Sequence, residues 1–209
     1  SNSVIIFANS DTKKNNFFIN NNNKLPLKLT FAGDIMAHKE NFSVEDFSKA
    51  YQNVKDFLIQ DDLTFANFET PVCNSVPYSS YPSFNVHTEY AQVSINAGFD
   101  VFSLANNHTN DQKINGIEQT LRFFTRQRSQ EVYSAGIKDN TFNSISYDII
   151  EKNGWRILFC AITEILNEIN NWIKIDYYPS TKNSREKLIN DLIQIKKKHP
   201  CDLFILSIH

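Results

Sequence analysis

Short runs of apolar residues alternate along this chain with longer stretches in which apolar residues recur at helical spacing. Near position 27 the alternation Leu-Lys-Leu-Thr-Phe predicts a strand that stops at Gly33. Apolar runs predict further strands over residues 63–66, 99–104, 145–150, 155–162 and 202–208. Apolar residues three and four apart predict helices over residues 43–58, 89–97, 114–128 and 184–199. Strands that alternate with helices are typical of a layered α/β fold.

Turn and loop signals refine this fold class. Asn153-Gly154 lies between two apolar runs and predicts a type I′ hairpin, since both positions of that turn need a positive φ. A hairpin would make the sheet mixed rather than purely parallel. Pro, Ser and Tyr residues gather between positions 71 and 82 and predict a long surface loop.

The chain divides into two predicted regions. Residues 1–26 are polar and include a run of asparagines, which indicates a tail or linker with a short strand around residues 4–7. Residues 27–209 would form the α/β domain. Because His209 comes directly after an apolar strand, we expect this domain to be incomplete at its C-terminal side.

Composition and charge narrow the class of protein. Hydrophobic residues make up 41% of the chain and charged residues 21%, as in ordinary globular domains. A net charge of −2 gives no reason to expect nucleic acid or an anionic membrane surface as a partner. The three cysteines lack the spacing of a zinc finger or redox motif. No apolar run reaches the roughly 18 residues that a membrane span needs.

Four polar clusters follow apolar strands, at residues 33–38, 67–71, 105–108 and 207–209. In an open α/β sheet, ligands bind at the carboxyl ends of the strands. The clusters would bring an Asp, a Glu, an Asn and two His residues to one edge, and these are suitable ligands for Mn, Zn, Fe or Mg. Singly, each cluster also fits a turn, a loop or a structural histidine. Their order and shared position therefore carry the metal-site hypothesis.

Several of these stretches resemble a known family. The runs at residues 67–71 (Asn-Phe-Glu-Thr-Pro) and 97–108 (Ala-Gly-Phe-Asp-Val-Phe-Ser-Leu-Ala-Asn-Asn-His) are similar to the bacterial poly-γ-glutamate capsule synthesis (CapA-type) family. That family is a branch of the calcineurin-like metallophosphoesterase superfamily. Residues 33–36 (Gly-Asp-Ile-Met) fit its opening motif, and residues 207–209 (Ser-Ile-His) resemble the start of its Ser-x-His-Trp-Gly motif. The resemblance implies a metallophosphoesterase-like α/β sandwich.

The resemblance also implies roles for individual residues. Glu69 would take the place of the bridging Asp of ordinary metallophosphoesterases, and Asn107 would bind through its side-chain oxygen. The implied ligands of a divalent metal are Asp34, Glu69, Asn107 and His209. His108 would be the catalytic acid that protonates the leaving oxygen, and Asp111 would orient its ring.

Two positions depart from the superfamily pattern. Met36 stands where ordinary metallophosphoesterases have a histidine, and His38 is out of register with that position. The departure predicts that one metal position is weak or empty. Residues 164–176, which include Trp172, would either cover the cleft as a lid or pack amphipathically beside it.

The resulting hypothesis is metal-dependent phosphoester hydrolysis or transfer, linked to the synthesis or export of an anionic polymer such as poly-γ-glutamate. The expected partners are that polymer or a phosphoester substrate, together with membrane-bound synthesis proteins, and no nucleic acid. A cell-envelope or extracytoplasmic location would follow, reached with a leader that precedes these residues; a cytoplasmic location stays open. One alternative is a non-catalytic envelope scaffold that binds polymer, which Met36 favours. Another is a metal-dependent amide hydrolase acting on the polymer.

Overall fold

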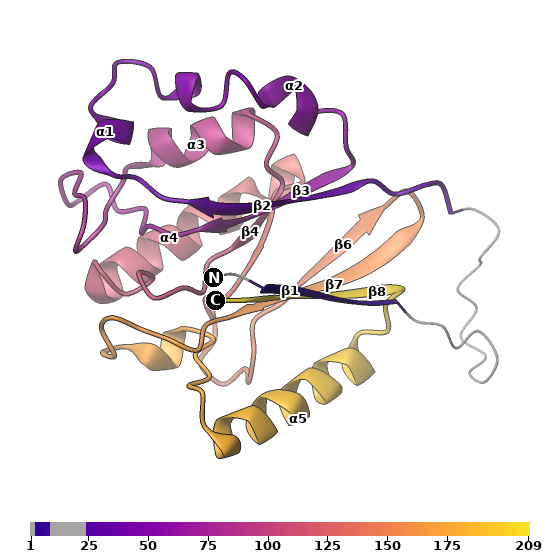
Figure 1. The fold of residues 1–209 in the computed structure, drawn as a ribbon. Coiled ribbons are helices and arrows are strands. Elements are labelled where there is room, and N and C mark those ends of the chain that lie inside the picture. Colours follow the sequence, from indigo (N-terminus) through magenta and orange to yellow (C-terminus); the bar gives the residue numbers. More distant parts are fainter. Residues whose placement is uncertain (1–2, 9–23) are drawn as a thin grey trace.

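The computed structural model describes residues 3–8 and 24–209, whose strands form two four-stranded sheets (Figure 1). One sheet has the order β2-β3-β4-β5 and the other β1-β8-β7-β6. The strands are β1 (Ser3–Ala8), β2 (Leu29–Ile35), β3 (Leu63–Phe68), β4 (Val101–Ser103), β5 (Tyr133–Ala135), β6 (Asp148–Lys152), β7 (Trp155–Ile162) and β8 (Leu203–Ile208). The helices are α1 (Lys39–Phe42), η2 (Phe47–Ala50), α2 (Lys55–Leu58), α3 (Thr88–Asn96), α4 (Lys113–Gln127), η3 (Arg128–Gln130), η4 (Trp172–Lys174) and α5 (Lys182–Lys198).

Alternating side chains divide each central strand between two cores. In β3, Leu63 and Phe65 face the second sheet, whereas Ala66 and Phe68 pack in the core beneath α3 and α4. The same period of two splits β7 and β8 between the inter-sheet core and the core beneath α5. The result is a helix–sheet–sheet–helix order of layers (Figure 1), which confirms the predicted α/β sandwich.

The mixed character of the sheet is confirmed in one of the two sheets. The sheet β2-β3-β4-β5 is parallel throughout. In the other, β7 and β8 are parallel, whereas β1 and β6 run antiparallel to their neighbours. The hairpin between β6 and β7 turns at Asn153 (φ 53°) and Gly154 (φ 80°), as the Asn-Gly pair predicts.

The long helices agree with their predicted ranges, and the other elements show where local pattern is insufficient. The predicted helices at 89–97, 114–128 and 184–199 are α3, α4 and α5, with ends that differ by at most two residues. The helix predicted over 43–58 is wrong. The carboxylate of Asp46 accepts a hydrogen bond from the Ser48 amide and begins a separate turn, η2, before α2.

The strand near position 27 continues past Gly33 to Ile35, with a register shift between Phe31 and Asp34. That extension places Asp34 inside the ladder, opposite Asn67 of β3. The short strand expected in the N-terminal segment is β1, which pairs with β8. Residues 1–2 and 9–23 of the predicted tail lie outside the described residues. Across the described ranges, no helix combines the length and apolar character needed to cross a membrane.

Candidate metal centre

Three side chains that are far apart in sequence converge beside the carboxyl ends of the strands. Asp34, Glu69 and His209 each offer one ligand atom, and these atoms lie within 4.8 Å of one another. Asp34 belongs to β2, Glu69 directly follows β3, and His209 directly follows β8 of the other sheet. Figure 1 shows the end of β2 and the end of β8 on the same side of the molecule. The cluster therefore forms where the two sheets meet.

Backbone pairing holds each of these residues in place. The Glu69 amide donates to the carbonyl of Ile35 at 2.9 Å, which keeps β2 and β3 paired up to the cluster. The His209 amide donates to Ile162 at the end of β7 at 3.1 Å, and the His209 carbonyl accepts from the Glu164 amide at 2.9 Å. Each candidate ligand is thus positioned by a sheet rather than by a free loop.

Asn67 connects the three side chains, although neither its sequence context nor the family resemblance gives it a role. Its Nδ2 donates to the Asp34 carboxylate at 2.9 Å and to the Glu69 carboxylate at 3.0 Å, and it lies 3.4 Å from Nδ1 of His209. Its Oδ1 accepts from Asn106 at 3.2 Å. The sequence signal that could have identified this residue is an asparagine inside an otherwise apolar strand, since a buried amide needs specific partners.

The electrostatics of the cluster favour a bound cation. Burial raises the pKa of Glu69 to about 7, and the negative charge and close contact of Asp34 contribute to the same shift. Burial also lowers the pKa of His209, against the opposing charge of Asp34, and favours the neutral imidazole that metals bind. Two carboxylates beside a neutral imidazole fit Mn, Zn or Fe, since a cation would relieve the repulsion between the carboxylates.

Asn107 lies at the border of this cluster. Its Oδ1 is 2.8 Å from Nε2 of His209, and because an amide oxygen only accepts, Nε2 carries the proton. Nε2 of His209 is also 3.8 Å from the Glu69 carboxylate. All four residues assigned to the metal by resemblance are therefore neighbours in space.

The two residues assigned to proton transfer form a buried pair next to the cluster. Nδ1 of His108 donates to Oδ2 of Asp111 at 2.8 Å, and the same oxygen accepts from the Phe84 amide at 2.7 Å. The His108 amide donates to Oδ1 of Asn106, and Nδ2 of Asn106 donates to Asn67. With Nδ1 held by Asp111, Nε2 is left as the nitrogen that can exchange a proton with a ligand.

A second residue without a sequence-based assignment is Asn167, on the segment after β7. Its amide donates to the Asn107 carbonyl at 3.0 Å, its Oδ1 accepts from the Asn107 side chain at 3.3 Å, and its Nδ2 lies 3.3 Å from Nδ1 of His108. Side-chain hydrogen bonds from Asn110 to the carbonyls of Glu168 and Asn170 also join this segment to the turn. The predicted lid region is thus attached to the residues around His108.

His38 does not join the cluster of candidate ligands. Its ring packs against Phe84 with centroids 5.1 Å apart, and Met36 is partly buried. Of the residues discussed as possible ligands, the structure therefore groups Asp34, Glu69, Asn107 and His209 and leaves His38 to one side.

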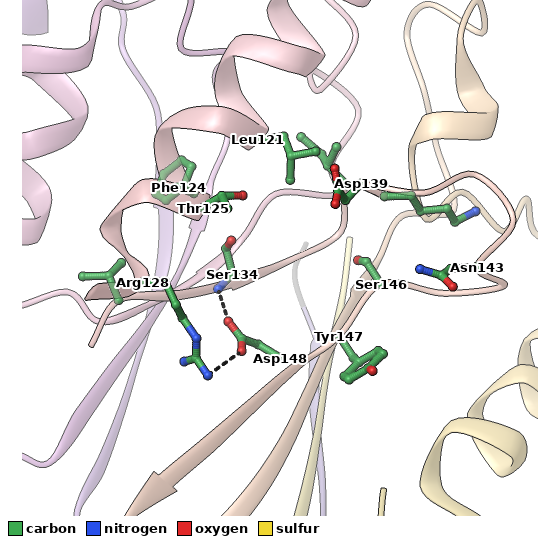
Figure 2. Close-up of a pocket in the computed structure, with 13 residues that line it drawn as sticks. Leu121, Phe124, Thr125, Arg128, Ser134, Asp139, Asn143, Ser146, Tyr147 and Asp148 are labelled. Atoms are coloured by element: carbon green, nitrogen blue, oxygen red, sulfur yellow. Dashed lines mark hydrogen bonds and ion pairs between the residues drawn. The ribbon is translucent and has the colours of Figure 1, made fainter. Parts of the chain in front are cut away.

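A pocket of about 300 Å³ lies elsewhere, between α4 and the connection from β5 to β6 (Figure 2). Figure 2 shows Arg128 beside Asp148 on one side and Asp139, Asn143 and Ser146 on another. Nη2 of Arg128 is 3.3 Å from Oδ1 of Asp148, so the two side chains form an ion pair. None of the residues that line this pocket belongs to the metal cluster, so the pocket and the candidate metal centre are separate sites.

Comparisons with known proteins agree with the capsule-family resemblance. The family described as "Bacterial capsule synthesis protein PGA_cap" matches residues 28–209. "Capsule biosynthesis protein CapA" of Bacillus anthracis is 26% identical over 195 residues, covering 88% of this chain and 46% of that protein. "PGA biosynthesis protein CapA" of Bacillus subtilis (strain 168) is 24% identical over 189 residues, covering 88% of this chain and 48% of that protein.

A solved structure of a hypothetical protein from Thermus thermophilus has a TM-score of 0.41 at 17% identity, covering 78% of this chain and 53% of that one. The chain spans about half the length of the curated relatives it matches.

Proposed function

This chain belongs to the bacterial capsule synthesis protein family PGA_cap, and we propose that it is a metal-dependent phosphoester hydrolase in the synthesis or export of a capsule polymer. The observation that carries the proposal is the convergence of Asp34, Glu69 and His209 from two sheets, beside the His108–Asp111 pair. A carboxylate with no ligand to bind would not need a second carboxylate and an imidazole beside it. A ligand cluster with an adjacent proton donor is what hydrolysis requires.

The residues of the cluster would have two roles, holding the metal and orienting its ligands. Asp34, Glu69, Asn107 and His209 would hold a divalent metal, and Asn67 would orient the two carboxylates through its amide. When bound, the metal would supply the positive charge that stabilises a phosphoryl group and lowers the pKa of water. The hydrogen bond from Nε2 of His209 to Asn107 must rearrange if that nitrogen is the one that ligates.

The His108–Asp111 pair would handle the proton of the leaving group. Asp111 fixes the ring and keeps a proton on Nδ1, so that Nε2 can donate to the leaving oxygen. Burial of both side chains keeps this geometry from relaxing into solvent. The substrate would be a phosphoester or anionic polymer at the cell envelope, with membrane-bound synthesis proteins as partners.

Metal content and hydrolysis of an aryl phosphate test the proposal together. The purified protein should bind Mn²⁺ or Zn²⁺ and hydrolyse 4-nitrophenyl phosphate. His108→Ala should lower kcat by about 100-fold or more with unchanged metal content, because general acid catalysis typically contributes 10²–10⁴. His199→Ala, which removes a histidine at the end of α5, is the matched control and should keep full activity. Full activity in His108→Ala would contradict the assignment.

Met36 favours one other function, a non-catalytic scaffold that binds polymer. This partly buried methionine stands where ordinary metallophosphoesterases have a histidine, so the ligand set lacks one imidazole. A protein that retains no metal and hydrolyses no phosphoester, yet still binds the polymer, would support the scaffold.

A further inference from the structure

Outside the metal cluster, one short loop is tied to the His108–Asp111 pair. The loop over residues 79–85 is closed by two backbone hydrogen bonds between Ser79 and Asn85, of 3.1 and 3.0 Å. Its Phe84 amide donates to the Asp111 carboxylate, and the Phe84 carbonyl accepts from the Gln112 side chain at 2.8 Å. The position of this loop is therefore set by the same turn that holds the proposed acid.

His38 packs against this loop. Its ring meets the Phe84 ring edge-on, with centroids 5.1 Å apart and an interplanar angle of 84°. The Phe84 ring in turn meets the His108 ring at 4.6 Å and 90°. The two imidazoles are thus separated by one buried phenyl ring. The neighbouring Lys39 amide donates to Ser80 at 3.2 Å and joins the segment after Asp34 to the loop.

His38 also begins the short helix α1. The backbone amide of His38 donates to the Asn41 side chain at 3.0 Å, and the His38 carbonyl accepts from the Asn41 backbone amide at 2.9 Å. On the same loop, Tyr81 is 73% exposed, with its ring 6.5 Å from Phe84. Two exposed polar rings, His38 and Tyr81, therefore contact Phe84, the residue whose ring also contacts His108.

We propose that His38 and Tyr81 are specificity residues that contact a ring-bearing alcohol group on the phosphoester substrate. The inference rests on the proposed phosphoesterase function and deepens it. Flat aromatic side chains with a polar atom suit a planar or sugar-like ring, because they give both stacking area and a hydrogen bond. The phosphoryl group would lie at the metal cluster, and the leaving group would pass His108 toward these rings.

Two non-hydrolysable phosphonates separate this role from metal binding. Dissociation constants for phenylphosphonate and methylphosphonate would be measured by calorimetry on the Mn²⁺-loaded protein. The variant H38A/Y81A should weaken phenylphosphonate binding about five- to tenfold, and methylphosphonate binding less than twofold. The matched control is H199A/Y147A, a second His–Tyr pair with rings 4.5 Å apart, and it should change neither constant.

The outcomes distinguish this inference from the proposed function. Equal weakening of both phosphonates in H38A/Y81A, or no change in either, would overturn the specificity role alone. A wild-type protein that binds neither phosphonate would overturn the proposed function and this inference with it. A selective loss for phenylphosphonate supports both.

Discussion

Two buried carboxyl groups in this molecule have opposite surroundings. Burial raises the pKa of both, Glu69 to about 7 and Asp176 to about 6. The Glu69 carboxyl faces another carboxylate, Asp34, which adds to the rise in its pKa. The Asp176 carboxylate instead lies 3.5 Å from the ammonium group of Lys138 and accepts hydrogen bonds from Ser146, and both contacts act to lower its pKa.

The difference separates a structural acid from a candidate ligand. The backbone of Asp176 bonds to Gly136 and Thr163, so its side chain and main chain together join three segments. Ser146, whose hydroxyl bonds to Asp176, lines the pocket of Figure 2. Around Asp176 the chain itself supplies the countercharge, which is the ammonium group of Lys138. In the metal cluster it supplies two carboxylates and an imidazole, a set that a divalent cation would complete.

Removal of the built-in cation should have the largest effect. Lys138→Met leaves the buried Asp176 carboxylate without its ammonium partner, and we expect a loss of about 3–5 kcal/mol in the free energy of unfolding. Urea unfolding at pH 7 measures it. The double variant K138M/D176N should recover much of the loss, since an amide needs no countercharge. A loss below about 1 kcal/mol in Lys138→Met would show that the pair is not a structural requirement.

The pH dependence of stability sharpens the same contrast. The folded pKa of Asp176, about 6, lies above its unfolded value of about 3.9, so the unfolded state releases its proton first as pH rises. Stability from this group is complete below about pH 4 and is lost between about pH 4 and 6, by up to about 3 kcal/mol. Asp176→Asn should flatten that part of the curve. Parallel curves for the two proteins, from urea unfolding at several pH values, would contradict the shift.

The smallest expected effect concerns the metal cluster. Glu69→Gln removes one carboxylate but keeps an oxygen that Asn67 can contact, so the fold should persist. We expect Mn²⁺ affinity to fall about 10- to 100-fold, or about 1.4–2.7 kcal/mol. Equilibrium dialysis measures the affinity, and Mn²⁺ should raise the Tm of the wild type more than that of the variant. Glu118→Gln, on α4, is the matched control; equal affinities in wild type and E69Q would exclude Glu69 as a ligand.

Local pattern predicted the elements that are long or strongly periodic. Apolar runs identified β7 and β8, and helical spacing identified α3, α4 and α5. It missed β5, which has three residues, and it merged η2 and α2 into one helix, since the Asp46 cap interrupts a spacing that otherwise continues. Pattern also ended the first domain strand too early, because pairing with β3 extends β2 past Gly33 to Asp34.

The sequence by itself determined the α/β class, the hairpin at Asn153-Gly154 and the polar residues that follow each strand, because these depend on periodicity and turn chemistry close in the chain. Only the tertiary structure decided which of those polar residues meet. Asn67 and His209 are 142 positions apart, yet their side chains touch because the two sheets stack with the carboxyl ends of β3 and β8 together. Local pattern does not predict that Asn67 contacts Asp34 or that Asn167 contacts Asn107, since each of these partners comes from a distant strand or turn.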